Sequence, residues 1–156
     1  MKILGKENPD LFNHLQNNGL NCTVQIQTAI VNSRGQIGAV QPCIISSGVV
    51  IIICNLADCS SESMFRADIV TNVHLFVRKL LSDGQNPVQF FEENISRLAG
   101  KILIGDEVGC GIVPMEAQDR LWRDETGRVY QMLARNADCV TRMWAGIPQE
   151  LKRKGE

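Results

Sequence analysis

A short loop that combines acidic residues and glycines gives the strongest indication of chemistry in this sequence. It follows an apolar run and has the sequence GDEVGCGIVP over residues 105–114. Asp106 and Glu107 place two carboxylates at the end of an expected strand, while Gly109 and Gly111 permit unusual backbone angles or a close approach of the backbone to a ligand. In open parallel sheets, ligands bind beyond the carboxyl ends of the strands. The loop is therefore a candidate ligand site, although its residue types fit equally a tight strand-to-helix connection with solvated acids.

The cysteines and histidines could in principle hold a metal. The six cysteines and two histidines are Cys22, Cys43, Cys54, Cys59, Cys110, Cys139, His14 and His74. No two cysteines have CxxC spacing, and neither histidine is close to a cysteine in the sequence. We therefore expect no zinc or other metal site, and we expect most thiols to be small core residues rather than disulfides.

The bulk composition limits the class of protein. The chain has 156 residues, of which 44% are hydrophobic, with a formal net charge of −1. These values predict one domain over residues 1–156 and give no sign of a nucleic-acid or membrane partner. The first ten residues lack the apolar core of a signal peptide, so we expect a cytoplasmic protein with reduced thiols.

The first part of the chain has short-range signals for a helix and a hairpin. Residues 9–18 follow Asn8 and begin with proline, which is typical of a helix start. Residues 22–31 alternate apolar and polar side chains, as a half-buried strand does. The turn residues 32–35 follow, and residues 36–40 return as a second strand. An N-terminal β-hairpin over residues 22–41 is the prediction.

The elements that must position the acidic loop alternate between strands and helices. We expect strands at 48–54, 101–104 and 139–145 and helices at 64–81, 87–98 and 116–136. Thr126 and Gly127 mark a point where the last helix could break, and residues 146–148 form a turn that leads the chain away. The run at 48–54 is continuous and β-branched, which fits a strand buried on both faces. The alternation predicts an α/β fold with a mainly parallel sheet flanked by helices.

The acidic loop and the residues after it resemble a known family. DEVGCGIVP (residues 106–114) is similar to the segment NEVGxGIVP of the adenosylcobinamide kinase/adenosylcobinamide-phosphate guanylyltransferase family, which works in cobalamin biosynthesis. The similarity continues in FRDxxGRxNQxLAxxAD and GxPxxxK, matched here by Arg123, Asp124, Gly127, Arg128, Gln131, Leu133, Ala134, Ala137, Asp138, Gly146, Pro148 and Lys152. Upstream, the expected strand at 49–53 leads to Met64 and Phe65, which is similar to the family's strand followed by the sequence NEMF. The resemblance therefore covers residues 49–152.

The resemblance implies a P-loop-NTPase-like fold, a homo-oligomer, and a transferase that uses GTP or ATP with magnesium on a corrinoid. Ligand-binding candidates are Asp106, Glu107, Gly109, Gly111, Arg123, Asp124 and Arg128, the last three having structural ion pairs as their plainer interpretation. The family's GxxxxGK[ST] loop, which cradles phosphates, follows its first strand. No such motif occurs in this sequence. Gly5 and Lys6 match only its Gly-Lys pair, and Pro9 removes a backbone N–H donor from the same stretch.

Two further parts of the family's chemistry have no counterpart in the sequence. Its strand-end aspartate, which helps to hold magnesium, falls on Cys54, and magnesium prefers oxygen ligands. Asp58 could replace it in a rebuilt loop, but we favour a loop or cap acid. The family's nucleophile stands in an HxxxR context. His14 has no such arginine after it, and His74 lies within the apolar helix expected at 64–81, where a partly buried structural residue is the favoured interpretation.

Three hypotheses follow. The first is a divergent family member with lost or altered catalysis that still binds a nucleotide, a corrinoid or a partner. The second is an active kinase/guanylyltransferase with a site rebuilt from Lys6, Asp58, Asp106 and Glu107. The third is a small α/β assembly module unrelated to corrinoids, in which Trp122 and Trp144 mark an interface; the alternative for both tryptophans is the core.

Overall fold

The computed structural model describes residues 23–27, 40–44 and 50–153, and side chains from residue 52 onward. The described strands form one seven-stranded sheet in the order β2-β3-β4-β5-β1-β6-β7. Their bounds are β1 Thr23–Gln27, β2 Val40–Ile44, β3 Val50–Asn55, β4 Ile69–Thr71, β5 Ile102–Asp106, β6 Cys139–Trp144 and β7 Ile147–Lys152. The strands from β3 to β6 in this order are parallel, and β2 and β7 add antiparallel edges. The α/β fold with a mainly parallel sheet is confirmed.

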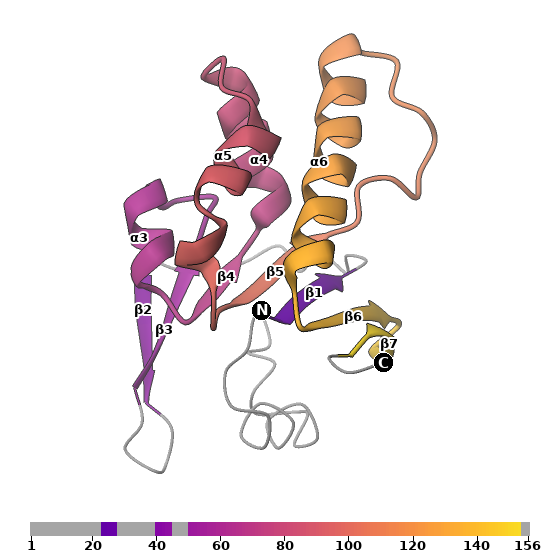
Figure 1. Ribbon diagram of the computed structural model, residues 1–156. Helices are drawn as coiled ribbons and strands as arrows, with labels where there is room; N and C mark the ends of the chain where they lie inside the picture. The colour runs from indigo at the N-terminus through magenta and orange to yellow at the C-terminus, as the bar shows by residue number, and fades with distance from the viewer. Residues whose placement is uncertain (1–22, 28–39, 45–49, 154–156) are drawn as a thin grey trace.

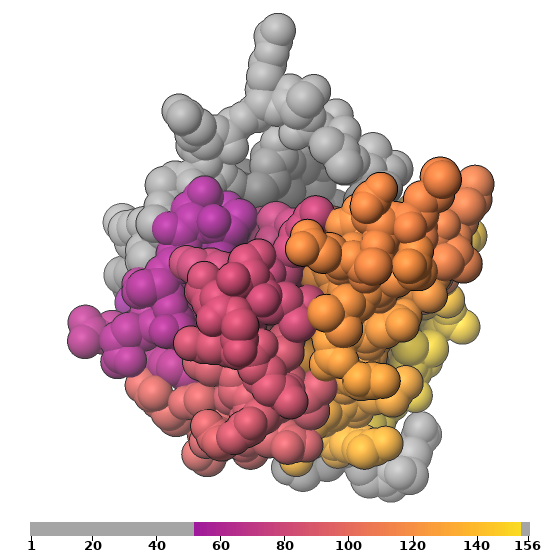
Figure 2. All heavy atoms as spheres, turned by 90° about the horizontal axis from the view of Figure 1, so that it is seen from above, coloured from indigo at the N-terminus to yellow at the C-terminus, as the bar shows by residue number. Residues whose placement is uncertain are grey.

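The described helices lie together above the sheet in the view of Figure 1. They are α3 Ser61–Arg66, α4 Val73–Ser82, α5 Pro87–Glu93, the 3-10 helix η1 Ile95–Leu98, and α6 Ala117–Asn136. Seen from above in Figure 2, α6 (orange) lies beside the α4–α5 pair, and the C-terminal strands (yellow) emerge beyond it. The loop from residue 107 to 116 connects the end of β5 to the start of α6.

The core lies between these helices and the sheet. Val70 and Leu103 of the inner strands are at most 1% exposed, and α6 contributes Val129 and Leu133 on one stripe. The rings of Phe76, Phe90 and Phe91 pack edge-to-face with centroids 5.4 to 6.1 Å apart. Burial of this stripe holds α6 against the sheet, which fixes the position of the residues on its other faces.

The predicted N-terminal hairpin is wrong in its pairing. β1 lies inside the sheet and is parallel to both β5 and β6, while β2 pairs antiparallel with β3 at the edge. The alternation in residues 22–31 identified a strand, but alternation carries no information about the neighbouring strand. The segment 28–39 and the expected helix at 9–18 lie outside the described residues.

The single helix predicted at 64–81 is also wrong. α3 ends at Arg66, β4 takes up Ile69–Thr71, and α4 begins at Val73. Asp68 explains the interruption, because its Oδ2 accepts a hydrogen bond from Ile52 N at 2.8 Å and its own N–H donates to Ile52 O. Its carbonyl oxygen accepts from Ile102 N at 2.9 Å, so the residue joins β4 to both of its neighbours.

The C-terminal region is more regular than its sequence indicates. α6 is continuous through Thr126 and Gly127, where the sequence predicts a break. The turn at Gly146 leads into β7 rather than away from the sheet. Ala145 and Gly146 both have positive φ, which makes the tight connection between β6 and β7. In the described part of the chain, no helix has the length and apolar character needed to cross a membrane.

Candidate functional site

The carboxyl end of β5 is joined to α4 and α6 by buried polar contacts. Asp106 N donates to Nδ1 of His74 at 3.1 Å, and the Asp106 carbonyl oxygen accepts from the Tyr130 hydroxyl at 3.0 Å. The peptide N–H of this strand end is therefore satisfied by one helix and its carbonyl by another. The Asp106 side chain remains one-third exposed at the carboxyl end of β5.

His74 is a structural histidine in this arrangement. It is 6% exposed, and its carbonyl oxygen accepts from Trp122 Nε1 at 2.7 Å. Burial lowers the pKa of His74, opposed by the nearby Asp106 carboxylate. Because Nδ1 accepts a hydrogen bond, the neutral ring carries its proton on Nε2, which faces Asp106 Oδ2 at 3.7 Å, a long electrostatic contact. His74 thus has no free lone pair for nucleophilic attack, in agreement with the structural interpretation.

Glu107, Cys110 and Arg142 form a second polar group beside this one. Arg142 Nη2 lies 2.8 Å from Glu107 Oε2, and the Cys110 thiol donates to Glu107 Oε1 at 2.8 Å. That hydrogen bond is the main cause of the raised pKa of Cys110, so this exposed thiol is held in its protonated, unreactive form. Arg142 comes from β6 and Glu107 follows β5, so the ion pair spans the carboxyl end of the intervening β1.

A pocket of about 260 Å³ opens next to this ion pair. One wall is a single stripe of α6, formed by Arg123, Thr126, Gly127 and Tyr130 at helical spacing. The remaining lining comes from Glu107, Val108 and Gly109 of the loop and from Arg142 and Leu151 of the β6–β7 hairpin. Of the residues expected to approach a ligand, Glu107, Gly109 and Arg123 therefore meet in one pocket.

The two loop glycines are not required by the backbone. Neither Gly109 nor Gly111 has positive φ, and a Cβ atom at either would meet nothing within 4 Å. The close approach in this region is at Gly105, where an added Cβ would lie 2.1 Å from the Tyr130 hydroxyl oxygen. Gly105 begins the quoted loop segment, but nothing in the local sequence indicates that a tyrosine 25 positions later packs on it.

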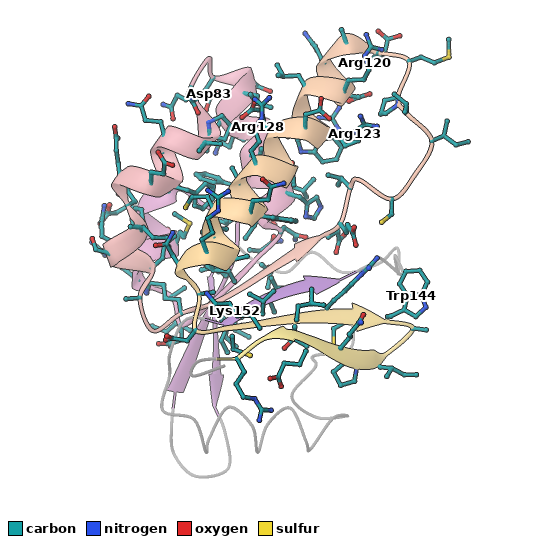
Figure 3. The ribbon with its side chains drawn as sticks, turned by 45° about the vertical axis from the view of Figure 1, so that its right-hand side comes forward. Asp83, Arg120, Arg123, Arg128, Trp144 and Lys152 are labelled. Carbon is teal, nitrogen blue, oxygen red and sulfur yellow. The ribbon has the colours of Figure 1, made fainter. Side chains whose placement is uncertain are left out.

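Asp124 and Arg128 do not line the pocket. Arg128 pairs with Glu125 one turn earlier on α6, and Asp124 accepts from the adjacent Arg123 at 3.2 Å. Figure 3 shows Arg123 and Arg128 extending from different sides of α6, as their separation of five residues requires. Arg142 and Tyr130, by contrast, are site residues that the sequence did not reveal, because their partners lie on other elements.

The end of β3 does not supply a magnesium ligand. Cys54 is fully buried, and burial together with the neighbouring Cys59 raises its pKa to about 12, so the thiol stays neutral. Asn55 Oδ1 is occupied by hydrogen bonds from Ala57 N and Asn72 Nδ2. Asp58 accepts from Asn55 Nδ2 at 2.8 Å and is an exposed loop acid. These residues do not fit magnesium, which prefers several carboxylate or water oxygens.

Among the described residues, no group of three or more histidine, cysteine and acidic side chains is placed to hold a metal ion. Lys6 lies outside the described part of the chain. Of the two tryptophans, Trp122 is partly buried and packs against the core, whereas Trp144 is 55% exposed at the β6–β7 turn.

Comparisons with known proteins cover the part of the chain that forms this site. The model of the family described as cobinamide kinase / cobinamide phosphate guanyltransferase matches residues 43–151, which include the acidic loop, α6 and most of the β6–β7 hairpin. The bifunctional adenosylcobalamin biosynthesis protein CobP of Pseudomonas aeruginosa is 38% identical over 61 residues. The aligned segment is 38% of this chain and 35% of the relative, so it spans about a third of that protein's length.

Proposed function

The chain belongs to the cobinamide kinase / cobinamide phosphate guanyltransferase family, and from this premise we propose that it is a divergent member with lost or altered catalysis that retains ligand or partner binding. The ligand is a nucleotide or a corrinoid, and it binds at the carboxyl edge of the sheet around the loop after β5. Asp106 and Glu107 line this edge, and Asp106 is open to solvent there.

The end of β3 carries the first half of the proposal. Phosphoryl transfer depends on neutralising charge with a metal and on a phosphate cradle. Cys54 stands where the resemblance places a magnesium ligand, and it is a buried neutral thiol. β1 is the earliest strand in the described part of the chain; the sequence directly after it, TAIVNSRGQIGA at 28–39, contains no lysine, and the Gly5-Lys6 pair precedes it.

The loop carries the second half. The matched segment leaves β5 at the edge where open sheets bind ligands, and it borders a pocket. The pocket alone, at about 260 Å³, is smaller than typical pockets of roughly 300–1,000 Å³, so a nucleotide or corrinoid would extend from it over the loop.

Calorimetry and a turnover assay test the proposal together. The full 156-residue chain is titrated with GTP and magnesium and, separately, with adenosylcobinamide, and is then assayed for product formation from adenosylcobinamide with GTP or ATP. We expect saturable binding of one ligand without product. Asp106→Asn should weaken that binding, since a carboxylate accepts stronger hydrogen bonds than an amide, and the matched control Asp83→Asn, on a distant helix end (Figure 3), should not.

Two results would contradict the proposal. Product above background would favour an active transferase with a rebuilt site. Absence of heat with both ligands would remove the ligand-binding half and leave partner binding.

A homo-oligomer is part of the same proposal. Large apolar side chains are exposed on the loop and on the β6–β7 hairpin, namely Ile112, Val113, Met115, Trp144, Ile147 and Leu151. Exposed apolar groups of this size are common at protein contacts. Sedimentation velocity over a range of concentrations should show a species larger than 17.3 kDa, and a monomer at all concentrations would refute this part.

A further inference from the structure

The pocket between α6 and the β6–β7 hairpin contains two arginines from different elements. Arg123 projects from α6 and Arg142 from β6, and both line the same cavity. Guanidinium groups on separate rigid elements can bind one anion from two sides, because each offers a planar fork of N–H donors.

Arg142 has a hydrogen-bond donor that no described residue satisfies. Its Nε is buried and has no hydrogen-bond partner among the described residues. Its Nη2 binds Glu107, and its guanidinium lies 5.1 Å from the ring centroid of Trp144. A buried donor without an acceptor is costly and calls for an explanation. A ligand in the pocket that turned the guanidinium of Arg142 toward itself would bring this donor to an acceptor.

The guanidinium of Arg123 also makes few hydrogen bonds. Its Nε and Nη2 share a single oxygen, Oδ1 of the adjacent Asp124, at 3.2 Å each, and its side chain is 23% exposed. This is a weak local pair, which leaves the guanidinium available to a stronger acceptor. Tyr130 also lines the pocket, but its hydroxyl already donates to Asp106 O. Burial raises the pKa of the phenol, so Tyr130 stays neutral and adds no charge to the pocket.

We propose that this pocket binds a compact oxyanion, the phosphate group of inorganic phosphate or of a small phosphomonoester, between Arg142 and Arg123. Glu107 is the internal counter-ion of Arg142 when the pocket is empty. A phosphate dianion carries more charge than this single carboxylate and therefore displaces it from the fork. The volume of about 260 Å³ suits a small ligand, and the site stands whether or not the chain binds GTP.

Calorimetry of the full chain with inorganic phosphate, at low and constant ionic strength, tests the site. We expect saturable binding by the unmodified protein. Arg142→Gln and Arg123→Gln should each weaken it about tenfold or more, the effect of losing one charge-assisted hydrogen bond. The matched control Arg128→Gln, on the same helix but outside the pocket, should leave it within about twofold. Glu107→Gln should tighten it, an increase that a purely structural ion pair would not give.

A second pair of variants avoids the arginines in case their replacement disturbs folding. A Cβ at Gly127 meets nothing within 4 Å, so Gly127→Leu fills the pocket from α6 while Gly127→Ala leaves most of it open. Gly127→Leu should abolish phosphate binding and Gly127→Ala should retain it.

Titration with glycerol 3-phosphate distinguishes the two sources of the anion. Tighter binding than inorganic phosphate means a phosphomonoester ligand, and weaker binding means the free ion; both support the site. No saturable heat with either probe, or binding that persists in Arg142→Gln, Arg123→Gln and Gly127→Leu, overturns it.

Discussion

The hydroxyl oxygen of Tyr130 occupies the space that a side chain on Gly105 would need, 2.1 Å from the position of its Cβ atom. The same hydroxyl donates to the carbonyl oxygen of the next residue, Asp106. α6 is thereby seated directly on the backbone of β5 at the edge where the candidate site lies. This contact fixes how far the pocket-lining residues of α6 lie from the sheet.

Gly105→Ala should therefore destabilise the protein by about 1–3 kcal/mol, the usual cost of overpacking. The Tyr130 ring is buried in the core, so it cannot move aside cheaply. Urea unfolding followed by circular dichroism measures the change. Gly127→Ala is the matched control: it has free space, and in a helix interior it should stabilise by up to about 1 kcal/mol. Equal effects of the two changes would contradict the packing argument.

Stability should fall as the pH drops below about 6.5, partly because of His74. Burial lowers the pKa of His74 in the folded chain below its ordinary value of 6.5, so the unfolded chain takes up the proton first. The contribution is complete above 6.5 and is lost as the pH falls toward the folded pKa.

His74→Asn isolates this effect. The Asn Oδ1 can still accept from Asp106 N, but the side chain does not titrate, so the free energy of unfolding should depend less on pH between 5 and 7. Unfolding curves across this range, compared between the two proteins, give the difference. Identical slopes would show that His74 is not held neutral by the fold.

Asp68→Ala should cost about 1–3 kcal/mol, since it leaves the partly buried Ile52 N of β3 without its side-chain acceptor. Asp68→Asn keeps an acceptor oxygen of similar shape and should cost less. Thermal unfolding of both variants provides the comparison. If both changes were neutral, the side chain would not be what joins β4 to β3.

Lys152→Met should cost about 0.5–1.5 kcal/mol. The Lys152 Nζ donates to the carbonyl oxygens of Ala134 and Arg135 at 3.0 Å each, at the C-terminus of α6, where a cation also complements the helix dipole. The neighbouring Arg153→Met, which removes an exposed pair with Glu150, is expected to cost less than about 0.5 kcal/mol. Chemical denaturation at two salt concentrations checks both values, and a larger loss for Arg153→Met would refute the capping role.

The sequence by itself determined the α/β class, the strand before the acidic loop, the long helix after it and the family resemblance, because these depend on local periodicity and on residues close together in the chain. It failed at β4, since Phe65, Ile69, Val73 and Phe76 fit a helical stripe even though Asp68 ties the middle of this segment into the sheet.

Only the tertiary structure decided which distant residues meet. The place of β1 between β5 and β6 brings Arg142 across to Glu107, 35 positions away, and the packing of α6 brings Tyr130 onto Gly105. Such pairings depend on strand order and on helix packing, which the spacing of residues along one segment does not encode.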